Sequence, residues 1–163
     1  MQTRFCEFSP CRTYRYTLQI IWDAQLPLIM FIGLNPSTAD ETNDDPTVRR
    51  CIQFAKDFGG GRLVMTNIFA FRSTDPKAML THPGDVVGPE NDAALVGSAH
   101  PAQLIICAWG KHGAHQGRGE AVRERIAAVR PLHCLRFNSD GSPAHPLYLP
   151  AKLRPVQFIG CWK

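Results

Sequence analysis

One unbroken apolar run, residues 26–33 (LPLIMFIG), constrains the fold of this chain more than any other feature. A strand that is exposed on one face alternates apolar and polar residues, whereas a continuous apolar run predicts a strand that is buried on both faces. Such strands belong to parallel sheets with helices packed against both sides. The run stops at Asn35-Pro36, so a loop is expected to begin there.

Strand and helix patterns alternate along the rest of the chain. Apolar segments predict strands at residues 14–22, 26–33, 62–71, 103–109, 132–137 and 155–159. Asp45-Pro46 predicts the start of a helix that ends at Gly59-Gly60-Gly61, and further helices are expected at residues 89–100 and 119–129. Strands that alternate with helices require crossover connections, so the predicted fold is a three-layer α/β/α domain with a mainly parallel central sheet. With 44% hydrophobic and 20% charged residues, the 163-residue chain (1–163) is expected to form a single domain.

The same composition bears on the compartment and on cofactors. No apolar run approaches the roughly 20 residues that cross a bilayer, and the N-terminus lacks the apolar core of a signal peptide. We therefore expect a cytoplasmic protein without a membrane partner, whose oligomeric state the sequence leaves open. Its six cysteines are expected to stay as thiols. Only Cys6 and Cys11 lie close together, and because no second pair completes a metal site, no metal or other cofactor is expected.

Polar residues follow three of the predicted strands, at the ends where open α/β sheets bind their ligands. The most distinctive segment is Gly33-Leu34-Asn35-Pro36-Ser37. Gly33 lets the backbone approach a ligand, Asn35 offers both an acceptor and a donor, and Pro36 stiffens the turn. Ser37 adds a hydroxyl that suits a phosphate. An Asx turn that only closes the strand explains the same residues equally well.

Two further polar residues are candidates for the same site. Asn67 lies within an apolar strand, where a buried amide must find partners and can pair with the edge of a nucleobase. His145 lies in a proline-rich loop and can donate or accept a hydrogen bond near neutral pH. A structural asparagine and an ordinary surface histidine are the alternatives. A ligand site requires the amides of Asn35 and Asn67 to converge on one cleft.

Taken in order, these segments resemble the uracil-DNA-glycosylase superfamily. Gly33-Leu34-Asn35-Pro36-Ser37 is similar to the Gly-x-Asn-Pro-Gly motif of two of its branches, with Ser37 in place of the last glycine. Thr66-Asn67 resembles a strand that ends in Thr-Asn, and His145-Pro146 resembles the start of a His-Pro-Ser motif, with Leu147 in place of the serine. More narrowly, the segments GLNPSTAD, DPTVRRC, NIFAFR, VGPEND and HPLYLP resemble a bacterial and phage family of uncharacterised function.

The resemblance implies a hydrolase that recognises a nucleobase and cleaves its N-glycosidic bond, either in DNA or in a free nucleoside or nucleotide. In this hypothesis Asn35, with Asp40, positions the attacking water, Asn67 reads the base edge, and His145 stabilises the departing base. Phe69 or Phe71 stacks on the base. The remaining substrate contacts are expected from Gly33, Pro36, Ser37, Arg72 and Lys111.

Two other functions stay open. One is a non-catalytic domain that binds nucleic acid or a nucleotide. Residues 111–163 hold nine Lys or Arg and three Asp or Glu, a balance of +6 that could face phosphates, although a solvated basic surface explains it as well. The other is a metal-assisted enzyme that uses the carboxylates of Asp40, Glu41 and Asp44.

Overall fold

The computed structural model of the protein describes residues 1–159, so Cys161 lies outside the described part of the chain. These residues form seven strands, four α-helices and one 3-10 helix, η1 (Lys111–Gly117). The strands are β1 (Thr3–Phe8), β2 (Arg15–Ile21), β3 (Leu28–Gly33), β4 (Arg62–Asn67), β5 (Leu104–Cys107), β6 (His133–Cys134) and β7 (Val156–Gln157). The α-helices are α1 (Pro46–Asp57), α2 (Pro76–Leu80), α3 (Asn91–Ala99) and α4 (Arg118–Ala127). The α/β class predicted from the sequence is confirmed.

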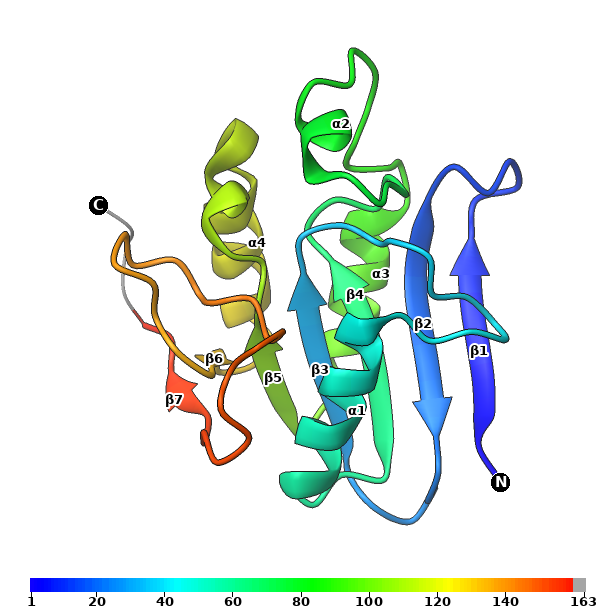
Figure 1. The fold of residues 1–163 in the computed structure, drawn as a ribbon, viewed down its shortest axis with the longest axis vertical. Helices are drawn as coiled ribbons and strands as arrows, with labels where there is room; N and C mark the ends of the chain where they lie inside the picture. The colour runs from blue at the N-terminus through cyan, green and yellow to red at the C-terminus, as the bar shows by residue number, and fades with distance from the viewer. Residues whose placement is uncertain (160–163) are drawn as a thin grey trace.

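All seven strands belong to one mixed sheet, in the order β1-β2-β4-β3-β5-β6-β7 (Figure 1). The four central strands, β4, β3, β5 and β6, run parallel to one another. The edges are antiparallel, because β1 pairs with β2, β2 with β4, and β7 with β6 in that sense. The prediction of a mainly parallel sheet therefore holds only for its four central strands.

The apolar run at residues 26–33 contains β3, which is buried on both faces as predicted. Ile29 and Phe31 pack in the cluster that includes the buried side of α1, while Met30 and Ile32 pack with α3 and α4. Figure 1 accordingly shows α1 in front of the sheet and α3 and α4 behind it. Two layers of helix explain why β3 contains no polar residue.

Helix α1 begins as its sequence indicates. The carboxylate of Asp45 accepts a hydrogen bond of 2.8 Å from the backbone N–H of Val48, and Pro46 occupies the first turn, where no N–H partner is needed. Gly59, with φ of +80°, follows the end of the helix in the left-handed conformation that favours glycine.

The structure differs from the predicted elements in three respects. The first strand is β1, which was missed because its exposed and half-buried residues do not alternate cleanly between polar and apolar types. The strand predicted at residues 62–71 ends at Asn67, so Phe69 and Phe71 lie beyond β4. The sheet is not mainly parallel, because the N-terminal hairpin and β7 add antiparallel edges.

None of the helices in residues 1–159 is long and apolar enough to cross a membrane. The cysteines within this range, Cys6, Cys11, Cys51, Cys107 and Cys134, are free thiols.

The packing of α1 gives a first test. Phe54 is 1% exposed in the core between α1 and the sheet, so Phe54→Ala should lower the free energy of unfolding by about 3–5 kcal/mol, the usual cost of deleting a buried aromatic ring. Gln53→Ala, at the exposed neighbouring position, should change it by less than about 0.5 kcal/mol. Urea denaturation followed by circular dichroism measures both values. Equal losses for the two variants would contradict the described orientation of α1.

Candidate functional site

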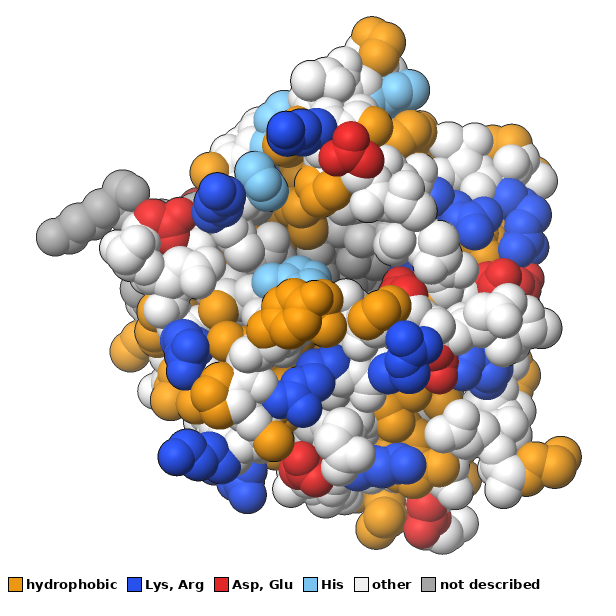
Figure 2. Space-filling view, in the orientation of Figure 1, with side chains coloured by type: hydrophobic (Ala, Val, Ile, Leu, Met, Phe, Trp, Pro, Cys, Tyr) orange, Lys and Arg blue, Asp and Glu red, His pale blue; other side chains and the backbone are white. Residues whose placement is uncertain are grey.

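A cavity of about 350 Å³ opens at the carboxyl ends of β3 and β4. It is lined by the ends of β3 and β4, the loop after β3, the N-terminal half of α1, and residues 73–76 and 145–147, together with Arg15 and Ala108. Figure 2 shows this face of the molecule hollowed near its centre, with a histidine at the edge of the hollow. The volume lies at the lower end of the range of about 300–1,000 Å³ that is usual for small-molecule sites.

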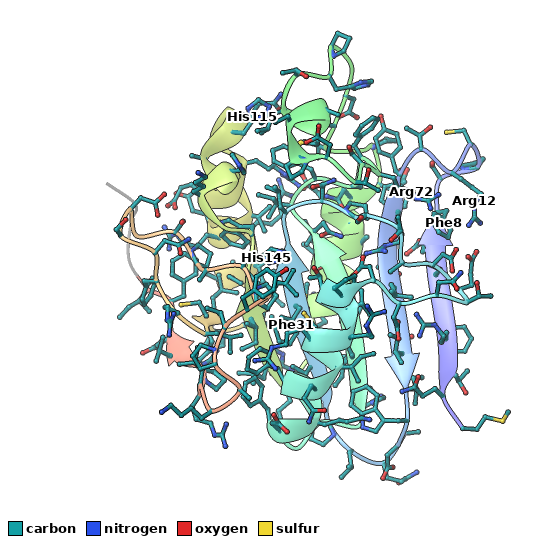
Figure 3. All side chains as sticks on the ribbon, viewed as in Figure 1. Phe8, Arg12, Phe31, Arg72, His115 and His145 are labelled. Carbon is teal, nitrogen blue, oxygen red and sulfur yellow. The ribbon has the colours of Figure 1, made fainter. Side chains whose placement is uncertain are left out.

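One wall of the cavity is apolar. Phe31 from β3 contributes the only aromatic ring other than His145 among the described lining residues, and Figure 3 shows these two side chains in the same region of the molecule. The other apolar side chains of this wall are Val48, Cys51, Met65 and Ala108. This part of the lining is apolar and almost fully buried, so it offers a ligand no competing hydrogen bonds.

Asn67 lies opposite Gly33 in the parallel register of β4 and β3. A Cβ atom on residue 33 would come within 2.8 Å of the Oδ1 atom of Asn67, so the glycine leaves the room that this amide occupies. Asn67 is 4% exposed, and its Nδ2 has no hydrogen-bond partner among residues 1–159. A buried donor without a partner costs about 1–3 kcal/mol, so this amide is suited to a ligand that supplies an acceptor.

Asn35 is held by its own loop. Its Nδ2 donates to the backbone carbonyls of Pro36, Phe71 and Ser73, at 3.2, 3.4 and 3.0 Å. These bonds fix residues 71–73 against the end of β3. No donor within the described residues contacts the Oδ1 of Asn35, so this oxygen is the part of the amide that remains for a ligand or a water molecule.

His145 stands at the mouth of the cavity, exposed on its outer side. Its Nδ1 accepts a hydrogen bond of 3.3 Å from the backbone N–H of Leu147. Partial burial lowers the pKa of His145 below its usual value, an effect that the carboxylate of Asp45 partly opposes. A neutral ring whose Nδ1 accepts must carry its proton on Nε2, so His145 presents a donor.

Sequence reasoning missed two charged residues of the cavity. Arg15 is 2% exposed, and its Nη1 donates to the carbonyl of Ala39 at 2.6 Å. Asp45 was explained as the cap of α1, which it is, yet its side chain also lines the cavity. The available signal was the position of Arg15 beside the buried residues Tyr16 and Leu18, because an arginine within a buried strand needs a partner.

Asp40 was expected to help activate water, but it does not line the cavity. Its Oδ1 closes a turn of its own loop, accepting hydrogen bonds from the backbone N–H groups of Thr42 and Asn43 at 2.8 and 2.9 Å. These bonds lower the pKa of Asp40 to about 2, which makes it a weak base.

The carboxylates proposed for a metal do not converge. Glu41 pairs with Arg12 at 2.9 Å and Asp44 pairs with Arg4 at 2.7 Å. Across residues 1–159 no group of three His, Cys, Asp or Glu side chains is placed to hold a metal ion. The acidic segment therefore serves to attach the loop to the N-terminal hairpin.

Four predicted substrate contacts also lie elsewhere. Phe69 is buried on the opposite face of the sheet, with the side chains of α3 and α4. Phe71 stacks on His82, with ring centroids 4.3 Å apart. Arg72 lies 4.8 Å from the centre of the Phe8 ring, in a group that Figure 3 shows well away from His145. Lys111 is exposed at the start of η1 and does not line the cavity.

Part of the basic C-terminal third is neutralised. Arg118 and Arg125 both pair with Asp92, at 2.6 and 3.2 Å, and Arg123 pairs with Glu120. On the face drawn in Figure 2, lysine and arginine side chains are interspersed with acidic and neutral ones. This arrangement gives little support to a continuous surface for nucleic acid.

A sequence profile for the protein family described as "Protein of unknown function (DUF1643)" matches residues 15–147. The matched span contains all of the cavity-lining residues, from Arg15 to Leu147. No curated protein and no solved structure matches the chain.

The state of His145 can be measured directly. An NMR titration of its ring protons should give a pKa below 6.5, because burial disfavours the imidazolium. As the pH falls, the unfolded chain takes up this proton before the folded chain, so the contribution of His145 to stability is lost below about pH 6.5. His145→Gln should remove the titrating resonance and weaken this pH dependence. A pKa at or above 6.5 would contradict the described environment.

Proposed function

We propose that this chain, which belongs to the DUF1643 family of unknown function, is a hydrolase that binds a nucleobase in its cavity and cleaves the N-glycosidic bond. The observation that carries the proposal is the amide of Asn67, buried at the end of β4 with a donor that no protein group satisfies within residues 1–159. An amide of this kind pairs with a base edge, donor to acceptor.

The neighbouring residues fit the same ligand. The side chains of Val48 and Met65 line the same cavity as Asn67 and, with the buried ring of Phe31, make part of the lining apolar. Gly33 opens the space in which that amide lies. A flat heterocycle can therefore meet an apolar surface with its face and a polar group with its edge, which is the usual way in which proteins read single bases.

Hydrolysis requires a positioned water and a stabilised leaving group. The free Oδ1 of Asn35 accepts a hydrogen bond from the water, whose oxygen bonds to C1′ of the sugar. The C1′–N bond breaks with its electron pair on the base, and the water's proton passes to solvent. His145, neutral and protonated on Nε2, donates to the departing base, which then takes a proton from solvent.

The architecture supports a relationship to the uracil-DNA-glycosylase superfamily. Helices cover both sides of the sheet, as in a three-layer α/β/α fold, and the cavity lies at the carboxyl ends of β3 and β4. The sequence segments that resemble that superfamily supply Gly33, Asn35, Asn67 and His145, and all four side chains or backbones line this one cavity.

A second candidate is a domain that binds a nucleobase compound without hydrolysing it. The position of Asp40 outside the cavity favours it, because Asp45 is then the only carboxylate among the described lining residues, and one of its oxygens already caps α1. Ligand affinity without release of free base would distinguish this binder from the hydrolase.

The hydrolase is tested by base release. Oligonucleotides that contain uracil, hydroxymethyluracil or hypoxanthine, and the corresponding free nucleosides and nucleotides, are incubated with the protein, and free base is measured by chromatography. Asn67→Asp replaces the donor with an acceptor and should lower kcat/KM by about 10- to 100-fold, since one bidentate base contact is worth about 1–3 kcal/mol.

Gln103→Glu is the matched control. It makes the same amide-to-carboxylate change at an exposed position next to the start of β5, outside the cavity, and should leave kcat/KM unchanged. Equal effects of the two substitutions would count against the role of Asn67, and the absence of base release from every substrate would refute hydrolysis.

A further inference from the structure

Arg15 is a buried cation that no carboxylate neutralises directly. It is 2% exposed and lines the cavity, yet within residues 1–159 no Asp or Glu lies within 4.0 Å of its guanidinium. One nitrogen, Nη1, donates to the carbonyl of Ala39, while Nε is buried without a partner. A guanidinium has five N–H donors, so most of the hydrogen-bonding capacity of Arg15 is unused.

Such an arrangement is costly unless something compensates it. Burial lowers the pKa of Arg15, and the nearby Cys6, Asp45 and Asp40 only partly offset this effect. Buried charges in proteins are normally paired, because an unpaired one loses its hydration without gaining a partner. The missing counter-charge is therefore expected to come from the ligand that fills the cavity.

Other groups around the cavity favour an anion. The N-terminal turn of α1, with its positive dipole end, contributes Thr47 and Val48 to the lining. The hydroxyls of Ser37, Thr47 and Thr74 also line it and have no hydrogen-bond partner among the described residues. Asp45 opposes an anion, but its Oδ1 is engaged by the N–H of Val48 and its charge lies against the helix dipole.

We propose that the cavity binds a free nucleoside monophosphate, with the base at Asn67 and the terminal phosphate paired with Arg15. This inference rests on the function proposed above and specifies its substrate class. The phosphate supplies oxygens to Arg15 and to the hydroxyls of Ser37, Thr47 and Thr74, while the base lies against the apolar part of the cavity lining.

The burial of Arg15 selects a terminal phosphate over the backbone of a nucleic acid. A phosphodiester continues into sugar on both sides, so it must lie where the chain can enter and leave. A guanidinium that is only 2% exposed is reached by the end of a molecule instead. The cavity volume of about 350 Å³ likewise suits one mononucleotide-sized ligand.

Calorimetric titration of the full chain tests this substrate class. The probes are uridine, adenosine, their 5′-monophosphates, inorganic phosphate and a single-stranded oligonucleotide. At least one monophosphate should bind about ten-fold or more tightly than its nucleoside, because a charge-assisted contact to Arg15 is added. Arg15→Gln should abolish that difference while leaving nucleoside affinity within about two-fold.

Arg62→Gln is the matched control. Arg62 also donates from its guanidinium to a backbone carbonyl, that of Leu26 at 3.2 Å, but it lies at the start of β4, away from the cavity. This variant should keep the preference for the monophosphate. If Arg15→Gln fails to fold, the affinities of the unaltered chain for a nucleoside and for its monophosphate still test the inference. Equal affinities for the two ligands would overturn it.

The outcomes separate this inference from the proposed function. If nucleosides and their monophosphates are bound, or release their base, with equal efficiency, the proposed role of Arg15 is overturned. The proposed base site at Asn67 is unaffected by that result. Preferential action on the oligonucleotide, unaffected by Arg15→Gln, would do the same and place the phosphates outside the cavity. If the protein binds none of the probes and releases no base from any of them, both the proposed function and this inference are overturned.

Discussion

The parallel register of β3 and β4 is the constraint on which the site depends. Because both strands run in the same direction, their carboxyl ends meet at one edge of the sheet and bring Gly33 opposite Asn67. The missing side chain of Gly33 gives the amide of Asn67 its place. A shift of one residue in this pairing would turn Asn67 to the opposite face, where α3 and α4 pack.

The antiparallel edge of the sheet contributes Arg15 to the cavity. Residues 34–45 leave β3 and cross toward β1 and β2, where arginines of the N-terminal hairpin hold them. Arg4 pairs with Asp44, Arg12 with Glu41, and Arg15 bonds to the carbonyl of Ala39. The acidic segment, which the sequence analysis considered as a metal site, thus has a structural role. The charged side chain that lines the cavity next to it is Arg15, at the start of β2.

Some polar atoms of the cavity hydrogen-bond within the protein, and others have no partner there. Asn35 uses its nitrogen to fix the loop and keeps its oxygen, whereas His145 uses Nδ1 in its own turn and keeps Nε2. Asn67 and Arg15 keep buried donors that the protein does not satisfy within its described residues. If the proposed ligand binds here, one without matching acceptors would leave these donors unpaired.

Features that depend on near neighbours along the chain could be predicted from the sequence alone. The burial of β3, the capped start of α1, and the placement of Gly33 and Asn35 at the end of a strand follow from local patterns of hydrophobicity, proline and glycine, whereas Asn67 was expected inside a strand that in fact ends there. Which side chains share the cavity could not be predicted in this way and was found in the three-dimensional structure. It brought in Arg15 and Phe31 and excluded Asp40, Phe69, Phe71, Arg72 and Lys111. The physical reason is that the face toward which a side chain points, and the charge it meets there, depend on pairing between strands that are distant in the sequence, and no local pattern encodes that pairing.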